Sequence, residues 1–211
     1  WMAEFNGSCP ACDNGGQSPN EWGTAKELGQ LLFTYLGDNA ASALVWDGYD
    51  NFAEHHNAWT YWGLLAYNQT SKLYTPRKRF YTAAQTFRFV PPGAQRMAAV
   101  EALSGLQAQA FYEAATGRVT IVGQNVGSTL LPLNGALTNL PSLSSFQLYQ
   151  TNSSLNFTQG ADISVSGGAF SLTVPSDTFF TLTGLAGTTP DTQAPTIPTA
   201  VQALAISSSR I

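Results

Sequence analysis

Two apolar runs near the start of the chain each carry residues that could take part in chemistry. In the first run, residues 1–5, Glu4 lies between Ala3 and Phe5. The second run, residues 42–46, is followed within ten positions by carboxylates, imidazoles and aromatic rings: Asp47, Tyr49, Asp50, Asn51, Glu54, His55 and His56. A carboxylate that is buried without a partner costs several kcal/mol. Glu4 therefore either has a chemical role or lies on a solvated rim, and the polar run is either a binding loop or a solvated loop.

A carboxylate at the end of an apolar strand has a defined role in retaining glycosidases. It attacks the sugar as a nucleophile, while a protonated carboxylic acid about 5 Å away protonates the leaving group. Aromatic residues on the same rim fit such a site, because the CH faces of sugar rings pack on indole and phenol rings. The chemistry that Glu4 indicates is therefore glycoside cleavage, provided that a second carboxyl group lies nearby.

The spacing of apolar residues predicts the elements that position Glu4 and Trp46. Residues 6–20 are rich in Gly, Pro, Asn and Ser and predict a loop. A helix over residues 21–36, ended by Gly37 as a left-handed cap, is predicted by apolar residues at helical spacing: Ala25, Leu28, Leu32 and Tyr35. The run 42–46 is typical of a strand buried on both faces. A strand, a helix and a strand with short connections form a βαβ unit with parallel strands, so Glu4 and Trp46 should share one rim.

After the polar loop, the sequence predicts one more helix and then a different kind of structure. Thr75 and Pro76 are expected to open the helix, with Pro at its first position, and residues 90–93 to end it. The basic cluster at 77–79 is interpreted as the solvated face of this helix. From residue 95 on, alternating runs (107–112, 118–122, 145–149, 169–174 and 179–183) are separated by turn residues (116–117, 134–135, 167–168 and 175–177). This pattern predicts an antiparallel β-sandwich.

Composition narrows the class of protein. Of the 211 residues, 10% are charged and 12% aromatic, and the net charge is −4 with nine basic residues. This profile is typical of a secreted, aromatic-rich protein and does not favour a nucleic-acid partner. There is no run of eighteen apolar residues, so no membrane partner is expected. The chain starts at Trp1 and ends in what resembles the start of a strand, so we expect a fragment cut at both ends.

Cys9 and Cys12 form a CxxC pattern inside the loop 6–20. A zinc ribbon needs a second pair, which the sequence lacks. A thioredoxin-type motif opens a helix after a strand, whereas this pair is expected in the middle of a loop. In an exported protein the pair favours a short disulfide that braces the loop beside Glu4, with reduced thiols as the alternative. The adjacent His55 and His56 have no metal-ligand spacing, so no metal is expected.

Several of these segments together resemble the last quarter of a clan A glycoside hydrolase barrel. They read, in order, WMAEF, a helix, SALVWDGYD, YTPRKRFY, a helix and RFVPPGAQRM. The chain is similar to the glucosylceramidase and endo-xylanase or endo-galactanase group, whose (β/α)8 TIM barrel is followed by a β-sandwich. Residues 168–185, with TVPSDTFFTLTG, resemble the final hairpin of that sandwich. The end of the chain, DTQAPTIPTAVQALAISSSRI, resembles a linker and the first strand of a fibronectin type III module.

The resemblance implies an α/β plus all-β fold in three parts. Residues 1–96 would be the C-terminal part of a TIM-barrel catalytic domain, with two parallel strands and their helices. Residues 97–187 would be the antiparallel β-sandwich, and residues 188–211 the linker and the start of the fibronectin-like module.

The resemblance also implies roles for individual residues. Glu4 matches the nucleophile at the end of the seventh barrel strand, and Trp46 matches the aromatic platform at the end of the eighth. The acid/base Glu of the family follows an Asn at the end of the fourth strand; Asn20-Glu21 opens a helix and does not match it. The fragment should therefore be inactive by itself. Further substrate contacts are expected from the rim and the polar loop: Trp1, Asp47, Tyr49, Asp50, Glu54, His55 and His56.

The sequence thus predicts a piece of a secreted retaining glycoside hydrolase that cleaves a β-linked polysaccharide by double displacement, needs no cofactor and is monomeric. The alternative is a non-catalytic carbohydrate-binding or adhesive cell-surface protein with a degenerate barrel. A CxxC oxidoreductase is a third possibility, for which no activity is expected.

Overall fold

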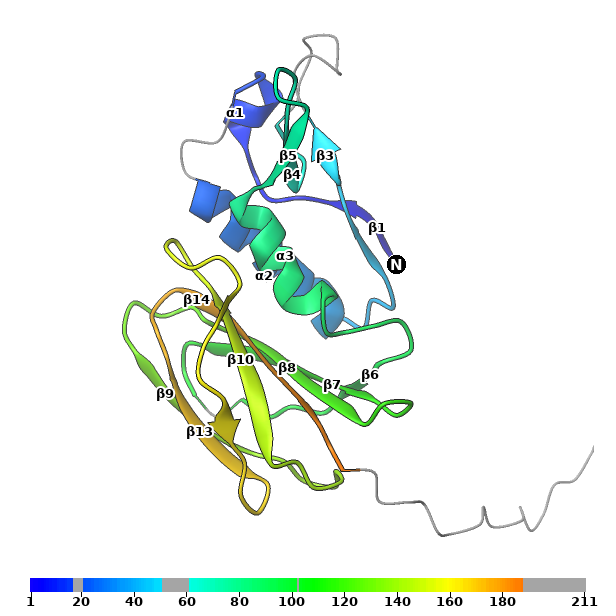
Figure 1. Cartoon of the computed structure of the whole chain (residues 1–211), viewed down its shortest axis with the longest axis vertical. Coiled ribbons are helices and arrows are strands. Elements are labelled where there is room, and N and C mark those ends of the chain that lie inside the picture. Colours follow the sequence, from blue (N-terminus) through cyan, green and yellow to red (C-terminus); the bar gives the residue numbers. More distant parts are fainter. Residues whose placement is uncertain (17–20, 51–60, 102, 188–211) are drawn as a thin grey trace, which may run out of the picture.

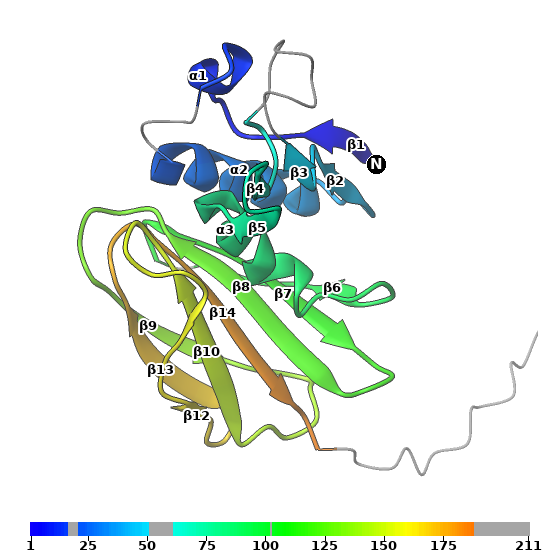
Figure 2. The ribbon, with the colours of Figure 1, turned by 45° about the horizontal axis from the view of Figure 1, so that its top comes forward.

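The computed structural model describes residues 1–16, 21–50, 61–101 and 103–187. These residues form an α/β part, residues 1–94, and a β part, residues 95–187. Figure 2 shows the arrangement in layers: a small sheet, then the helices α2 and α3, then the large sheet of the β part. The predicted linker and fibronectin-like segment, residues 188–211, lies outside the described residues.

The α/β part begins with a strand, a helix and a second strand that runs parallel to the first (Figure 1). The strands are β1 (Met2–Phe5) and β2 (Ala43–Val45), and α2 (Glu21–Gly37) connects them. Met2 pairs with Ala43, and Phe5 pairs with Val45. The predicted helix and the predicted parallel pairing are therefore confirmed.

One face of the β1–β2 pair packs on the helices, and the other face is open. Phe5 joins Leu28 and Leu32 of α2 and Ala83 of α3 in one apolar cluster. On the other face, Leu44 is 54% exposed although it is the central residue of β2. The prediction that this strand is buried on both faces is wrong for this structure, because the helices cover only one side of a two-stranded sheet.

Three short strands and the helix α3 complete the α/β part. The strands form the sheet β3-β4-β5, in which β3 is parallel and β5 antiparallel to β4; their bounds are Tyr49–Asp50, Leu65–Asn68 and Leu73–Pro76. Helix α3 spans Lys78–Phe87, with Arg77 at its N-cap. The prediction that Pro76 opens this helix is wrong. Pro76 is the last residue of β5 and pairs with Leu65.

The β part contains a large antiparallel sheet in the order β11-β10-β14-β8-β7-β6, with β12 paired to one end of β10, and a second sheet of β9 and β13. The bounds are β6 Gln95–Met97, β7 Leu106–Glu113, β8 Arg118–Asn125, β9 Leu131–Ala136, β10 Ser145–Thr151, β11 Thr158–Gln159, β12 Ile163–Ser164, β13 Ala169–Val174 and β14 Thr178–Leu185. The β9–β13 pair covers one face of the large sheet (Figure 1). An apolar core fills the space between the two sheets, and it includes Val119, Phe146, Phe170, Leu172, Val174, Phe180 and Leu182.

The other face of the large sheet packs against the helices of the α/β part. Phe33 of α2 lies in a cluster with Phe111, Val122 and Phe179. Beside this cluster, the Thr181 hydroxyl donates to Gln85 Oε1 of α3 at 2.6 Å. The large sheet is thus covered on both faces, in contrast to the β1–β2 pair.

Two turn predictions are wrong. Asn134-Gly135 lies inside β9, where Gly135 pairs with Phe170; a Cβ on Gly135 would come within 2.1 Å of the Phe170 ring, so glycine serves close packing there. Gly37 is the last residue of α2, and Asn39 (φ 63°) takes the left-handed conformation instead. Asn tolerates that conformation better than most residues.

Within the described residues, no helix has both the length and the apolar character needed to cross a membrane.

Candidate active-site groove

The carboxyl ends of β1 and β2 border a groove of about 640 Å³. The residues that line it are Glu4, Phe5, Asn6, Gly7, Ser8, Asp13, Trp46 and Trp62. Glu4 comes from β1, and Trp46 directly follows β2. Since parallel strands end on the same side, the two residues lie on one rim, as the sequence predicts.

Glu4 is exposed, while its neighbour Phe5 points into the apolar cluster below the groove. No hydrogen bond or ion pair holds the Glu4 carboxylate within the part of the chain that the structure describes. An ionised carboxylate in this position can accept hydrogen bonds from a polyol or attack an electrophilic carbon. Trp46 is 37% exposed on the same rim and offers an aromatic surface beside it. The Trp46–Asp47 peptide bond is cis.

Asn6 links the backbones of two aromatic residues of the groove. Its Nδ2 donates to the carbonyl oxygen of Trp46 and, at 2.9 Å, to the carbonyl oxygen of Trp62, and its Oδ1 accepts from Gly7 N at 2.9 Å. Gly7 in turn lies against α2, where an added Cβ would come within 2.3 Å of the Thr24 carbonyl oxygen. The chain after β1 is therefore fixed against both α2 and the opposite side of the groove.

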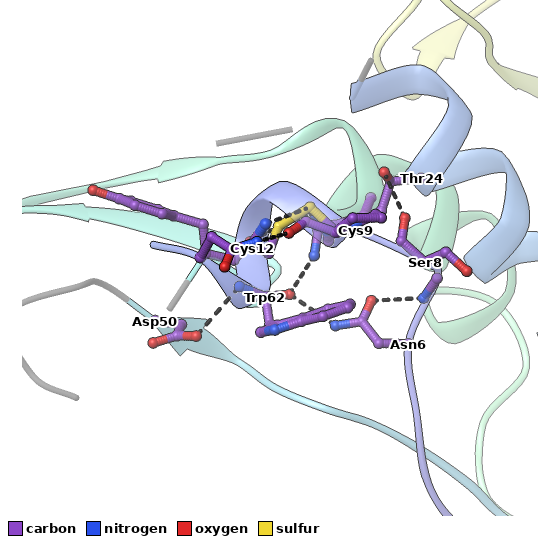
Figure 3. Close-up of a disulfide and its surroundings, with 12 residues drawn as sticks. Asn6, Ser8, Cys9, Cys12, Thr24, Asp50 and Trp62 are labelled. Atoms are coloured by element: carbon purple, nitrogen blue, oxygen red, sulfur yellow. Dashed lines mark hydrogen bonds between the residues drawn. A yellow bond between two sulfur atoms is a disulfide. The ribbon is translucent and has the colours of Figure 1, made fainter. Parts of the chain in front are cut away.

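Trp62 is held from further directions (Figure 3). Its backbone N–H donates to Asp50 Oδ2 at 3.2 Å, and its carbonyl oxygen accepts from Arg79 Nη1 at 2.6 Å. The same guanidinium donates through Nη2 to the Cys12 sulfur at 3.8 Å. Arg79 thus connects Trp62 to the disulfide of the loop after β1.

The basic cluster at 77–79 is not a solvated face, so that prediction is wrong. Arg77 is 7% exposed and Arg79 is 1% exposed. Burial, and secondarily the charge of Arg77, lowers the pKa of Arg79 to about 10, so the group stays charged at neutral pH. The Arg77 guanidinium lies over the Tyr61 ring, 5.1 Å from its centroid, and burial lowers its pKa too. Both arginines lie where the chain passes from β5 into α3, and Arg79 contacts the groove residue Trp62.

Cys9 and Cys12 form a disulfide with a Cα–Cα distance of 5.2 Å. The expectation that the pair lies mid-loop is wrong, because Cys9 is the N-cap of a short helix, α1 (Pro10–Asp13). Cys12 is fully buried, and its sulfur lies 3.1 Å from the carbonyl oxygen of Tyr61. The disulfide therefore packs directly against the segment that carries Trp62.

The other predicted substrate contacts are placed differently. Trp1 is 90% exposed and does not line the groove. Tyr49 packs edge-to-face on Tyr74 outside the groove lining, and Asp47, partly buried, is also outside it. Asp50 is 1% exposed and serves the Trp62 backbone, so the predicted sugar contact by Asp50 does not fit. Glu54, His55 and His56 lie outside the described residues.

Six residues that line the groove were not predicted as site residues from the sequence: Phe5, Asn6, Gly7, Ser8, Asp13 and Trp62. Ser8 is fixed by Glu27 of α2, which accepts from the Ser8 amide at 2.8 Å and from its hydroxyl at 2.9 Å. Asn6 directly follows the strand that carries Glu4, which is the one signal that the sequence offered. Among the described residues, no group of three or more His, Cys, Asp or Glu side chains is arranged to hold a metal ion.

Known structures with the same fold were found, whereas no protein-family model and no curated protein sequence matches this chain. A glycoside hydrolase family 30 endoxylanase from Clostridium papyrosolvens C71 superposes with a TM-score of 0.66 at 22% identity, over 88% of this chain and 42% of that one. A family 30 subfamily 8 xylanase from Clostridium acetobutylicum gives a TM-score of 0.66 at 21% identity, over 88% and 42%. The catalytic domain of a family 30 xylanase from Talaromyces cellulolyticus gives 0.66 at 17% identity, over 87% and 40%.

The likeness is one of fold. The chain has the fold of the C-terminal region of these family 30 xylanases and spans less than half of their length. The resemblance to clan A glycoside hydrolases is therefore confirmed at this level.

Proposed function

We propose that this chain is the C-terminal portion of a secreted retaining glycoside hydrolase that acts on a β-linked polysaccharide. The observation that carries the proposal is the placement of Glu4 and Trp46 at the ends of adjacent parallel strands, on one groove. The fold shared with family 30 xylanases supports it. The disulfide between Cys9 and Cys12 suits an oxidising, extracellular compartment.

In this proposal β1 and β2 are two neighbouring strands of a (β/α)8 barrel. Helices cover one face of the pair, and the open face carries Leu44 and the exposed Ala3. In a closed barrel that face packs against side chains of the other strands. The rest of the barrel would be supplied by residues outside the 211, and the β part would act as its brace.

The reaction follows from the two-carboxylate scheme of retaining enzymes. Glu4 attacks the anomeric carbon, the bond to the leaving sugar oxygen breaks, and a second carboxylic acid gives that oxygen its proton. The same group, now a carboxylate, takes a proton from water, which attacks the anomeric carbon and releases Glu4. Trp46 supports the ring that is cleaved. The acid/base is expected outside this chain, so the chain alone should be inactive.

The decisive experiment measures reducing-sugar release by the full protein that contains this chain, on xylan, glucan and galactan. Replacing the nucleophile in Glu4→Gln should lower the rate by about 10⁴-fold or more. Asp13→Asn is the matched control, because Asp13 also lines the groove with a carboxylate and belongs to the short helix α1 rather than to a strand. Loss of activity in Asp13→Asn with activity retained in Glu4→Gln would refute the assignment.

A second readout separates the hydrolase from a carbohydrate-binding protein without catalysis. A 2-fluoro sugar with a good leaving group should add its mass to the peptide that contains Glu4, because the proposed glycosyl-enzyme is covalent. A full protein that binds the polysaccharides but releases no sugar and takes no label would be a binding protein.

A further inference from the structure

Trp62 combines a fixed backbone with a side chain that lines the groove. Its carbonyl oxygen accepts two hydrogen bonds, from Asn6 Nδ2 at 2.9 Å and from Arg79 Nη1 at 2.6 Å, and its N–H donates to Asp50 Oδ2 at 3.2 Å. Figure 3 shows Trp62 between Asp50 and Asn6. The three partners come from the end of β3, the segment after β1 and the start of α3. Side chains of distant segments therefore converge on one loop residue.

The next residue, Gly63, adds a steric constraint. An added Cβ on Gly63 would come within 2.6 Å of backbone atoms of Tyr49 and Asp50. The loop is therefore pressed against β3 directly after Trp62. Only glycine allows this close approach. The backbone is therefore fixed both at Trp62 and directly after it, and this fixes the direction of the Trp62 side chain.

Burying Arg79 costs free energy. Its use to hold a loop therefore indicates that the position of this loop is important. A buried arginine loses its hydration, and this loss is recovered only through well-formed hydrogen bonds. Two of its hydrogen bonds go to the Trp62 carbonyl oxygen and the Cys12 sulfur. Arg79 and the disulfide thus form one support beneath the groove.

The backbones of Trp46 and Trp62, which both line the groove, are also fixed relative to each other. The single amide of Asn6 donates to the carbonyl oxygens of both Trp46 and Trp62. Asn6 lies two residues after Glu4, so the same short segment carries the carboxylate and links the backbones of the two tryptophans. An array of this kind suits a ligand with repeated flat apolar faces, as in a β-linked sugar chain.

We propose that Trp62 is a substrate-binding residue whose indole packs on a sugar ring of the polysaccharide neighbouring the ring on Trp46, and that Asn6, Asp50 and Arg79 are positioning residues for it. This inference rests on the proposed function, because it names the part of that groove that binds a second sugar unit. Trp62 then contributes to binding of the chain and does not take part in bond cleavage.

The first test measures binding of xylohexaose and cellohexaose by calorimetry to the full protein with Glu4→Gln, which prevents turnover. Trp62→Ala should weaken the better-bound hexaose by about tenfold to a hundredfold, and Trp62→Phe should recover part of this loss. Trp22→Phe is the matched control: Trp22 packs on Phe179 and bonds Asp177 away from the groove, so its replacement should leave binding unchanged. Equal affinity for Trp62→Ala and the parent would overturn the proposal.

A measurement that keeps Trp62 in place covers the case in which Trp62→Ala does not fold. Limited oxidation of the full protein with Glu4→Gln by N-bromosuccinimide, read by peptide mass spectrometry, should modify Trp62 in the free protein and spare it at saturating hexaose. Trp1, which is exposed and outside the groove lining, should be modified in both states. Equal modification of Trp62 with and without bound hexaose would contradict the inference.

The positioning role of Arg79 is tested by a double-mutant cycle. Arg79→Met should weaken hexaose binding when Trp62 is present and have no further effect in a Trp62→Ala background, because Arg79 acts through Trp62. Arg79→Lys should restore part of the affinity. Equal losses in both backgrounds would show a merely structural role.

The outcomes also separate this inference from the proposed function. If Trp62→Ala hydrolyses the polysaccharide with an unchanged KM, the proposed hydrolase function is retained, and Trp62 is not part of the substrate site. Hexaose binding that depends on Trp62 in a full protein without hydrolytic activity would retain the site and refute the catalytic assignment.

Discussion

The two sheets that flank the helices differ in how completely they are covered. The large sheet of the β part has the β9–β13 pair on one face and the helices on the other, so residues of both faces of β14 are buried (Figure 2). Within the described part of the chain, the β1–β2 sheet has helices on one face only, and it consists of two strands with open edges. A sheet with open edges and an open apolar face invites association with further chain.

The apolar core and the candidate groove therefore lie in different parts of the molecule. The β part has an apolar core between its own two sheets, and burial of apolar surface is the main favourable term in folding. The α/β part instead leaves its groove residues at the open end of a small sheet, held by hydrogen bonds to Asn6, Asp50 and Arg79. The groove is therefore expected to depend on segments outside the 211 residues, whereas the β part should not.

The largest effect on stability is expected from the core of the large sheet. Leu182 in β14 is fully buried between the two sheets of the β part. Leu182→Ala removes apolar contacts and leaves a cavity, so it should lower the free energy of unfolding by about 2–5 kcal/mol. Urea denaturation of the full protein, followed by circular dichroism, measures this change.

Leu185 in the same strand provides the matched control, because it is 58% exposed. Leu185→Ala should change the free energy of unfolding by less than about 0.5–1 kcal/mol. Similar losses for both variants would mean that the core of the β part is less tightly packed than the burial of Leu182 indicates.

A smaller effect is expected where the two parts meet. An added Cβ on Gly29 of α2 would come within 2.5 Å of Phe179 Cζ in β14 and within 2.5 Å of Thr82 Cγ2 in α3. Gly29→Ala should therefore separate α2 from the large sheet and destabilise the protein by about 1–3 kcal/mol, despite the higher helix propensity of Ala. Thermal unfolding monitored by near-UV circular dichroism checks this.

Gly37→Ala is the control in the same helix. Among the described residues, an added Cβ on Gly37 would meet the end of the flexible Gln109 side chain at 3.3 Å and no other atom within 4 Å, so the substitution should be neutral or slightly stabilising. A stabilised Gly29→Ala variant would show that α2 does not press on the large sheet.

Much of the fold was predictable because it follows from patterns within single segments. The helix over 21–36 has a clear apolar spacing, and the five alternating runs of the β part each became a strand. Elements set by distant contacts were missed. The strand β9 carries Asn134-Gly135 in its middle, because Gly135 makes room for the Phe170 ring, which no local pattern reveals.

The groove was predictable in the same limited way. Glu4 and Trp46 follow from the parallel strands alone, since their ends must meet. The supports of the groove do not follow, because the type of a residue does not tell where it points. Arg79 stands in a basic cluster that suits a solvated helix, yet it is buried under Trp62. Trp62 lies sixteen positions after Trp46, and the side chain of Asn6 links the backbones of the two residues.

The smallest effect on stability, and the sharpest contrast with Leu182, is expected at Leu44. Both are leucines inside strands, but Leu44 is 54% exposed on the open face of the β1–β2 sheet. In the isolated 211-residue chain, Leu44→Ser should change stability by less than about 0.5 kcal/mol and reduce binding of a hydrophobic dye. In the full protein it should destabilise by about 2–5 kcal/mol if further strands bury that face. An equally small effect in both proteins would mean that nothing covers the open face, and the barrel assignment would fail while the fold of the β part stayed intact.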